Sequence, residues 1–266
     1  MTTPSNKSII KAIDLVELVC GAPNGLSLRE AALAAHLPVA TTHRLLTTLK
    51  SAGAIRSGAD GLYTLGPRLI ALHEREARAR DAVRRAIEDH LAEMLTGPPS
   101  RSLRFSVLDA TELLIYAGVD NGVDPKMRSQ VGARYEAYCT APGKVLLAGL
   151  SGRKLEDYVF GAGFVPLTPN TITMPSRLAG ELKRVCSSGY ALDDGEFIAG
   201  VRCLAVPVRL GEGQVIAALS VAGEELPLQT IPRLAADLAA SAAVLAAKLE
   251  CIPGSLRALQ DPHDRL

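Results

Sequence analysis

The sequence predicts an α+β chain of two domains: a winged helix-turn-helix, helical with a β wing, and an α/β domain, joined by a linker helix. Two amphipathic segments and a hairpin signal lie in order within residues 27–65, and strand-like and helix-like segments fill the second half. At 266 residues the chain is long enough for two ordinary cores. We expect the first domain at 8–67, the linker helix at 68–82, the second domain at 83–252 and a tail at 253–266.

The first domain opens with a predicted helix that Ser8 can cap. Its apolar residues at helical spacing are Ile9, Ile13, Val16 and Cys20. After a Pro-Asn-Gly break, Ser27 and Glu30 form a capping box, in which each side chain satisfies a backbone N–H of the other residue. Leu37-Pro38 then ends this second helix and begins a third, because proline is tolerated in a first helical turn.

The third helix, residues 39–52, has one apolar and one polar face. Leu45, Leu46 and Leu49 point inward by their spacing. A helix with one face of hydrogen-bond donors suits the major groove of DNA. The candidate DNA-binding residues on this helix are Thr41, Thr42, His43, Arg44, Thr47, Thr48 and Lys50, with Thr42 expected to lie half buried beneath Leu46.

A two-stranded wing is predicted after this helix. Gly53 is placed to end the helix, and residues 55–57 and 62–65 alternate like strands around an Asp-Gly turn. Arg56 is the candidate DNA-binding residue of the wing, which usually contacts phosphate or the minor groove. Such patterns also arise by chance, but the ordered set of signals favours DNA binding over a small helical domain.

Two of these residues have alternative interpretations. Arg44 could contact guanine or phosphate, or form a structural salt bridge to Glu30. His43 could pack or contact a base. These alternatives stay open at the level of sequence.

The second half follows a charged helical segment that begins at Gly66-Pro67 and ends at residues 97–100. Such a helix transmits geometry or pairs with a second copy, although its arginines can also be plain solvated surface. Strands are predicted at 103–107, 113–117, 203–208 and 215–221, and helices at 142–150, 151–160, 175–187 and 231–249. A sheet flanked by helices is typical of a sensory α+β module.

Composition excludes several classes of protein. The net charge of +1 is not the strongly basic balance of a protein that coats nucleic acid, but a dimer with two DNA-binding helices can bind with modest local charge, so the overall charge decides nothing. We find no apolar run long enough to span a bilayer. The first eight residues lack a hydrophobic signal core, so we expect a cytoplasmic protein. Five scattered cysteines without CxxC spacing predict neither disulfides nor a metal site, and nothing indicates a cofactor.

The chain resembles the IclR family of bacterial transcriptional regulators from about Ser8 to Leu249. In the first domain the resemblance rests on Ser27-Leu28 with Glu30, on Leu37-Pro38, on residues 41–46 and on the stretch from Gly61 to Leu69. In the second domain the matching stretches are Ala141-Pro142-Gly143-Lys144, residues 167–173, Gly189-Tyr190-Ala191, Asp193-Asp194-Gly195-Glu196, Gly200-Val201-Arg202-Cys203 with Ala205 and Pro207, and residues 217–221.

This resemblance implies a winged helix on double-stranded operator DNA and a GAF-like effector-binding domain. Members form dimers or dimers of dimers, and repress or activate operons for the breakdown of small carbon compounds. Their effectors are small organic acids or aromatic compounds, bound between the sheet and the helix and loop that follow the first strands. The effector-binding candidates carried over by motif are Gly143, Asp193, Asp194, Cys203 and Ser220.

Several positions depart from the family pattern. Val39-Ala40 replaces a polar or basic pair, and His36 stands where glycine is common, a position that histidine tolerates because it enters positive φ more readily than most residues. Tyr138-Cys139 replaces a histidine and a small residue, and Ala222 replaces a second serine. An added tyrosine and a missing hydroxyl favour a larger, more apolar or aromatic ligand.

Two other classes of function remain at this stage. One is a cysteine-dependent redox enzyme with a GAF-like domain, using Cys139, Cys186 or Cys203; the other is an architectural protein without a ligand. Because no histidine lies between Leu91 and Pro262, a histidine-based triad or zinc site in the second domain is excluded, apart from His90 or His263. Asp193-Asp194 can equally be a solvated turn, and Cys203 an inert buried residue. We therefore expect a regulator without catalytic residues.

Overall fold

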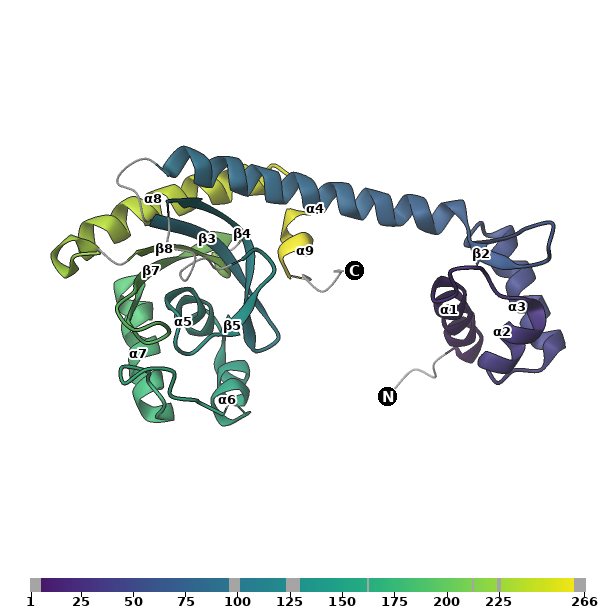
Figure 1. Ribbon diagram of the computed structural model, residues 1–266, viewed down its shortest axis with the longest axis horizontal. Helices are drawn as coiled ribbons and strands as arrows, with labels where there is room; N and C mark the ends of the chain where they lie inside the picture. The colour runs from purple at the N-terminus through teal and green to yellow at the C-terminus, as the bar shows by residue number, and fades with distance from the viewer. Residues whose placement is uncertain are drawn as a thin grey trace. The chain divides into compact units, whose positions relative to one another are not determined.

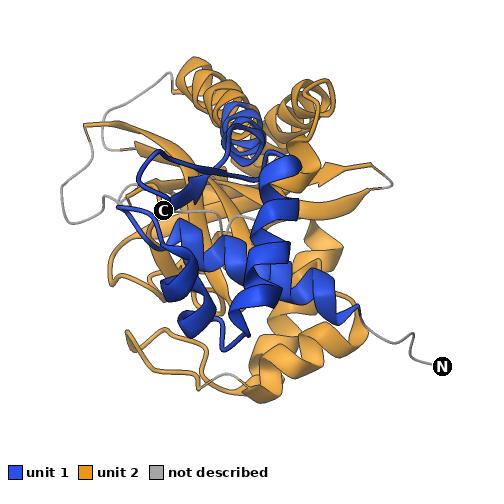
Figure 2. Cartoon of the chain, turned by 90° about the vertical axis from the view of Figure 1, so that its right-hand side faces the viewer, with its two compact units in different colours: residues 1–78 blue, residues 79–266 orange. Residues whose placement is uncertain are grey.

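The computed structural model describes residues 6–95, 101–122, 130–161, 163–211, 213–223 and 226–260. The chain forms two compact units that meet within one helix, at Arg78 and Ala79 (Figure 2). Residues 97–100, where the sequence predicts the end of the charged segment, lie outside the described residues.

The first unit is a winged helix-turn-helix. Helices α1 (Lys7–Cys20), α2 (Leu28–Ala34) and α3 (Val39–Ser51) are followed by strands β1 (Ile55–Ser57) and β2 (Tyr63–Leu65) (Figure 1). The strands pair antiparallel as the wing, and Leu26 adds a bridge to Tyr63. The predicted arrangement of the first domain is therefore confirmed.

Local signals place the ends of these helices. Ser27 Oγ accepts from the N–H of Glu30, and the Glu30 carboxylate accepts from the N–H of Ser27, which completes the capping box and lowers the pKa of Glu30. His36 adopts a φ of 51° in the turn between α2 and α3, as the departure from glycine requires. Gly53, at a φ of 73°, ends α3 in the left-handed region.

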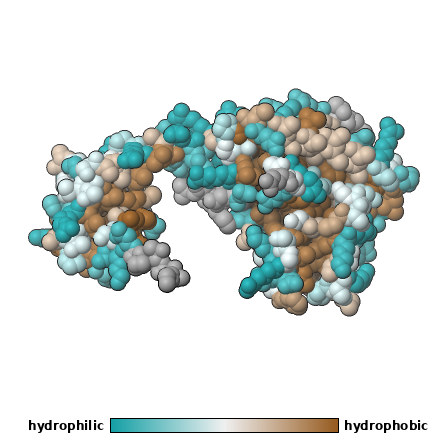
Figure 3. All heavy atoms as spheres, turned by 180° about the vertical axis from the view of Figure 1, so that it is seen from behind, coloured by the Kyte–Doolittle hydropathy of each residue, from teal (hydrophilic) through white to brown (hydrophobic). Residues whose placement is uncertain are grey.

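The predicted apolar face of the first helix is wrong. Asn6, not Ser8, caps α1, and its buried residues are Leu15 and Val19. Ile9 and Ile13 are each more than half exposed. Isoleucines at helical spacing are buried only if the rest of the unit packs against their side of the helix. Here the other side packs inward: Leu15 and Val19 form the core of the unit with Ala31, Leu46 and Ile55. The face of this unit seen in Figure 3 carries apolar surface.

Helix α4 (Pro67–Met94) is a single 28-residue helix that begins directly after the wing. Its second half belongs to the second unit, where Val83, Ile87 and Leu91 are fully buried. His90 on the same helix contacts the hydroxyl of Ser241 on α8 (Ile231–Glu250) at 2.8 Å. The end of α4, beyond the stretch 68–82 predicted as the linker, is therefore part of the core of the second domain.

The second unit is built on a six-stranded antiparallel sheet with the order β5-β4-β3-β8-β7-β6. Its strands are β3 (Arg101–Asp109), β4 (Glu112–Asn121), β5 (Arg134–Glu136), β6 (Ala191–Asp194), β7 (Arg202–Leu210) and β8 (Gln214–Gly223). Its other helices are α5 (Ala141–Ala148), α6 (Gly152–Gly161), α7 (Pro175–Ser188) and α9 (Ser255–Gln260), with a 3-10 turn at Leu228–Thr230.

Helices cover both faces of this sheet (Figure 1). On one face Leu103, Phe105 and Val107 pack with residues of α4 and α8 in the main core. On the other face Ala205 and Ala218 pack under α5. Because successive residues of a strand point to opposite faces, β3 contributes to both layers at once. This observed architecture confirms the predicted fold class.

Three short elements were not expected from the sequence. Strands β5 and β6 have only three and four residues, too few for an alternation to be recognised. Helix α9 lies in the stretch expected to be a tail, but Ala258 and Leu259 are buried in the main core. The residues up to Gln260 are therefore part of the second domain, because they cover apolar surface of the sheet.

One helix contradicts the expectation that no apolar run could span a bilayer. The stretch Leu228–Glu250 is long and apolar enough by length and composition. A single such helix is weak evidence for a membrane span, since Leu238, Leu245 and Leu249 pack in the core of the domain.

Removing the capping box should destabilise the first unit. Replacing Ser27 by alanine leaves a helix N–H without its acceptor, at a cost of about 0.5–2 kcal/mol in the free energy of unfolding. Replacing Ser8, whose side chain caps nothing, is the matched control and should change stability far less. Chemical denaturation of the two variants measures this, and equal losses would contradict the assignment of the cap.

Candidate functional site

The exposed face of α3 carries most of the predicted DNA-binding residues. His43, Arg44, Thr47, Thr48 and Lys50 are exposed, and Thr41 is partly exposed. Arg44 forms no ion pair with Glu30 among the interactions of the described residues, and Glu30 is held instead by Ser27. The structural salt bridge considered for Arg44 is thus absent, and its guanidinium is available to a partner.

Thr42 is a correction to the predicted DNA-binding set. Its side chain is fully buried, and Oγ1 donates to the carbonyl of Pro38 at 3.2 Å. A side chain that faces the core beside Leu46 cannot reach a groove. The helical period places residue 42 on the inner face, one turn before Leu46.

The wing is connected to α3 by side-chain hydrogen bonds. Lys50 Nζ donates to Ser57 Oγ at 2.6 Å, which joins the end of the helix to β1. Arg56 Nε donates to Thr64 Oγ1 at 3.1 Å across the two strands. These contacts bring the predicted residues of the helix and of the wing onto one connected surface.

The second unit contains a cavity of about 320 Å³ on the α5 side of the sheet. Polar side chains from four strands and from the start of α5 line it: Ser102, Arg104, Thr140, Asp193, Cys203 and Ser220. Its apolar lining consists of Leu113, Ile115, Tyr135, Pro142, Phe197, Ile198, Val201 and Ala222. A small concave site with few polar groups among apolar walls is typical of metabolite binding.

Strand register explains why the polar residues meet. Asp193 lies opposite Cys203, and Cys203 lies opposite Ala222. Ser220 lies opposite Arg104 on the next strand. Residues paired across strands point to the same face of a sheet, so these side chains share the floor of the cavity.

Asp193 is the buried carboxylate of the cavity, only 5% exposed. Its Oδ1 accepts from the backbone N–H groups of Glu196 and Phe197, at 2.6 and 3.3 Å. Burial raises the pKa of Asp193 to about 7, although these two hydrogen bonds lower it. Asp193 therefore changes charge near neutral pH, while also positioning the loop 195–201.

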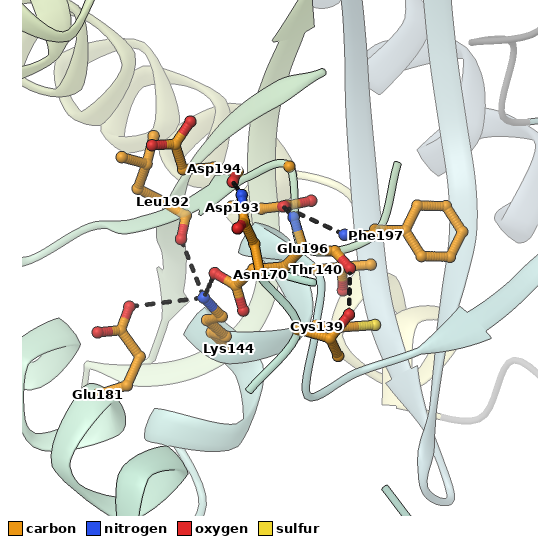
Figure 4. A network of polar contacts seen from close by, with 12 residues as sticks. Cys139, Thr140, Lys144, Asn170, Glu181, Leu192, Asp193, Asp194, Glu196 and Phe197 are labelled. Carbon is orange, nitrogen blue, oxygen red and sulfur yellow. Dashed lines mark hydrogen bonds and ion pairs between the residues drawn. The ribbon is translucent and has the colours of Figure 1, made fainter. Parts of the chain in front are cut away.

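Lys144 on α5 holds the same loop from below (Figure 4). Its side chain is fully buried, and Nζ donates to the carbonyl of Leu192 at 3.0 Å and pairs with the carboxylate of Glu196. Glu181 on α7 lies 3.6 Å from the same ammonium group. Thr171 Oγ1 also donates to the carbonyl of Glu196, at 2.7 Å. The loop that carries Phe197 and Ile198 over the cavity is thus fastened at several points.

Two predicted effector-binding residues do not line the cavity. Gly143 lies in the first turn of α5, where its N–H donates to Thr140 Oγ1 and a Cβ would overlap the backbone of Ala137. Close packing against Ala137, rather than a ligand, therefore requires glycine at position 143. Asp194 points to the opposite face of β6 and pairs with Arg202 at 2.6 Å. By contrast, Asp193, Cys203 and Ser220 all line the cavity as predicted.

Sequence reasoning missed Arg104, Ser102 and Thr140. Ser102, Arg104 and Ser106 alternate with the apolar residues of β3, which signals that a strand buried on both faces has one polar side. Phe197 and Tyr135 were also missed, and their rings meet edge to face with centroids 5.1 Å apart.

The surroundings of Cys139 and Cys203 do not favour redox chemistry at these two thiols. Burial raises the pKa of the Cys203 thiol, and burial also raises the pKa of Cys139 to about 12. The thiolate is the reactive form of cysteine, and these shifts disfavour it at neutral pH. All five cysteines are free, and among the described residues no cluster of histidine, cysteine and carboxylate groups could hold a metal ion.

Neutralising Asp193 should change how stability depends on pH. Because its pKa is raised on folding, the folded state binds the proton more tightly, and this stabilisation is lost as pH rises from about 4 to about 7. Asp193→Asn removes that loss, so we expect its melting temperature, relative to wild type, to be higher at about pH 8 than at about pH 5. Each pKa unit corresponds to about 1.4 kcal/mol.

Asp194→Asn is the matched control for this experiment, because Asp194 lies outside the cavity and pairs with Arg202. It should not reproduce the pH-dependent gain. A difference between Asp193→Asn and wild type that is the same at both pH values would contradict the raised pKa.

Comparisons with known proteins agree with this geometry. The family model of the IclR helix-turn-helix domain matches residues 8–58, and that of the bacterial transcriptional regulator IclR C-terminal domain matches residues 80–246. The chain is 30% identical over 219 residues to the HTH-type transcriptional regulator XynR of Escherichia coli strain K12, covering 82% of this chain and 86% of XynR. It is 31% identical over 220 residues to the repressor YiaJ of the same organism, covering 81% and 77%.

Solved structures have the same fold. The IclR protein of Thermotoga maritima is 26% identical, with a TM-score of 0.60 that covers 91% of this chain and 98% of that one. An IclR homologue from Microbacterium hydrocarbonoxydans, complexed with 4-hydroxybenzoate, is 23% identical, with a TM-score of 0.55 and coverage of 95% and 100%. The curated relatives of this chain are transcriptional regulators rather than enzymes. This chain belongs to the IclR family of DNA-binding transcriptional regulators.

Proposed function

We propose that this regulator binds operator DNA through α3 and the wing, and that a small organic metabolite in the cavity of the second domain modulates this binding. The observation that carries the proposal is the pairing of an exposed basic helix face with a cavity on a separate domain. The target is an operon for the breakdown of a small carbon compound, and the protein acts in the cytoplasm.

The DNA-binding surface combines base and backbone contacts. Arg44 and His43 face outward from the middle of α3 and are the candidates for base edges, while Lys50 and Arg56 suit phosphates. Pro38 supplies no side-chain cap to α3, so the N–H groups of its first turn can also donate to a phosphate. This compensates for the apolar Val39-Ala40 pair at the start of the helix.

The cavity suits a small organic acid or aromatic compound. Its volume of about 320 Å³ lies at the small end of the range for metabolite sites. The complex of the Microbacterium homologue with 4-hydroxybenzoate supports an aromatic acid as one class of effector. Asp193, Cys203 and Ser220 are the effector-binding residues of the proposal.

A route from the cavity to the linker helix exists within one strand. Arg104 lines the cavity, whereas its neighbours Leu103 and Phe105 pack in the core that contains Val83 and Ile87 of α4. A ligand that shifts β3 thereby acts on the helix that continues to the wing. A coupling of about 1–3 kcal/mol suffices to change operator occupancy. We further propose a dimer or a dimer of dimers, in which paired winged helices bind two half-sites.

Loss of Arg44 should remove operator binding. Arg44→Ala is expected to lower affinity at least about tenfold, because each bidentate base contact is worth about 1–3 kcal/mol. A gel shift measures this on a duplex that the wild-type protein selects from a random pool. Arg153→Ala, an exposed arginine on α6, is the control. Unchanged affinity of a folded Arg44→Ala protein would refute the role of this residue.

Loss of Ser220 should weaken the response to the effector without weakening the binding of DNA. A thermal-shift screen of the full-length protein against aromatic and aliphatic carboxylates identifies the compound to use. Ser220→Ala is then expected to shift the dose response of operator release to concentrations several times higher. Ser187→Ala, on the exposed face of α7, should leave it unchanged. An identical dose response for Ser220→Ala would remove this residue from the site.

A further inference from the structure

Helix α4 carries a buried histidine on the face that packs against the second domain. His90 is 5% exposed and follows Val83 and Ile87 on the buried stripe of this helix. Its ring contacts Ser241 of α8, and the two helices lie side by side on one face of the sheet (Figure 1). An ionisable ring therefore lies within the contact that joins α4 to the rest of the second domain.

Both ring nitrogens of His90 face polar groups of α8. Nε2 lies 2.8 Å from Oγ of Ser241 and 3.2 Å from the carbonyl oxygen of the same residue. Nδ1 lies 3.2 Å from Nζ of Lys248, which is about two helical turns farther along α8. The hydroxyl of Ser241 in turn donates to the sulfur of Met94 on α4 at 2.8 Å. The ring is thus held at both of its polar atoms.

These contacts define the protonation state of the ring. A lysine ammonium group is only a donor, so Nδ1 accepts from Lys248 and the single ring proton lies on Nε2, from which it is donated to Ser241. The hydroxyl proton of Ser241 is directed at Met94, which leaves its oxygen as the acceptor. The arrangement is therefore complete only for a neutral ring. A second proton, on Nδ1, would face the ammonium group directly.

The charged groups that face the ring are Lys248 from α8 and Glu93 from α4. Burial lowers the pKa of His90 and Lys248 lowers it further, whereas the backbone of Ser241 and the carboxylate of Glu93 raise it. Glu93 lies 3.9 Å from Nδ1, but its side chain is 68% exposed, so water screens its attraction for a charged ring. Protonation is thus opposed while the ring is packed, and a protonated ring is more stable where water can solvate it.

Directional contacts define the position of α4 along α8 more strictly than apolar ones do. Val83, Ile87 and Leu91 hold α4 against the main core, but the hydrophobic effect has no preferred direction. The hydrogen bonds of His90 are satisfied only when its ring lies between Ser241 and Lys248. Because α4 is one helix that begins directly after the wing, a displacement of its end is passed to the residues next to the wing.

We propose that His90 is a positioning residue for operator binding: its neutral ring holds α4 in place on α8, and a proton taken up on Nδ1 releases the helix and lowers the affinity for DNA. The inference rests on the proposed function, because it requires α4 to transmit the state of the second domain to the winged helix. The proton acts on the α8 side of the sheet, whereas the cavity lies on the α5 side. It is therefore a signal separate from the metabolite.

The pH profile of operator binding tests this proposal. Fluorescence anisotropy measures the affinity for the selected duplex between about pH 8 and about pH 5.5 at constant ionic strength. Because the pKa is lowered by packing from about 6.5, the contribution of His90 to affinity should be constant above that pH and fall below it, by up to about tenfold per pH unit. His90→Gln keeps a donor for Ser241 but takes up no proton, so this part of the fall should disappear. Overlapping profiles of the wild type and His90→Gln overturn the proposal.

His73→Gln is the matched control, because it removes an exposed histidine from the first half of the same helix. It should keep the wild-type profile. Other groups that titrate in this range, Asp193 among them, are present in the wild type and in both variants, so their effects cancel in the comparison. A profile that changes as much in His73→Gln as in His90→Gln overturns the assignment to His90.

Two exposed neighbours provide a test that a purely structural role would not satisfy, and it also serves if His90→Gln does not fold. Lys248→Met removes the cation beside Nδ1 and should move the fall in affinity to higher pH, whereas Glu93→Gln removes the anion and should move it to lower pH. NMR of the histidine rings in the same proteins should show the His90 titration moving in these opposite directions. Unmoved or parallel titrations, or a ring proton on Nδ1 at about pH 8, overturn the proposal.

Failure of this inference can be told apart from failure of the proposed function. Binding at about pH 8 and its dependence on Arg44 are measured first, where His90 is neutral. Binding that requires Arg44 but has the same pH profile with and without His90 overturns the inference and retains the DNA-binding regulator. A wild-type protein that selects no duplex refutes the proposed function, and this inference with it.

Discussion

The cavity of the second domain depends on a buried ion pair between Lys144 and Glu196. The lysine is fully buried on α5, and its partner lies in the loop between β6 and β7 that brings Phe197 over the cavity. Removing one member of such a pair costs about 3–5 kcal/mol, because it leaves an uncompensated charge away from water. The carbonyl of Leu192 and the carboxylate of Glu181 complete the surroundings of the ammonium group. The pair therefore fixes the distance between α5 and the edge of the sheet, and with it the space that a ligand can enter.

This network brings together several stretches that carry the family resemblance and that lie far from one another in the sequence. Lys144 follows Ala141-Pro142-Gly143, Glu196 ends Asp193-Asp194-Gly195-Glu196, and Thr171 belongs to the stretch 167–173. In the structure all three meet at one loop, where Thr171 and Lys144 bind Glu196 and Asp193 binds its backbone. Together they hold the loop beside the cavity, and Asp193 alone among them also lines it.

Local signals predicted the winged helix well, because each of its decisive features is short-range. The capping box, the Leu37-Pro38 break, the left-handed Gly53 and the Asp-Gly hairpin all involve residues within a few positions of one another. Helix α1 is the exception. Two sets of apolar residues satisfy a helical period there, and only contacts with Ala31, Leu46 and Ile55 decide that Leu15 and Val19 are buried while Ile9 and Ile13 are exposed.

The sequence by itself predicted the fold class and the polar face of α3, because periodicity and motif are properties of neighbouring residues. Three of the five effector-binding candidates, Asp193, Cys203 and Ser220, line the cavity, and their role in binding an effector stays a prediction. Tertiary structure decided what depends on strand pairing and close approach. It excluded Gly143 and Asp194 from the cavity, buried Thr42, and brought Arg104 across Gly118 to face the cavity. Register between strands distant in sequence places side chains on a shared face, and no local pattern specifies that pairing.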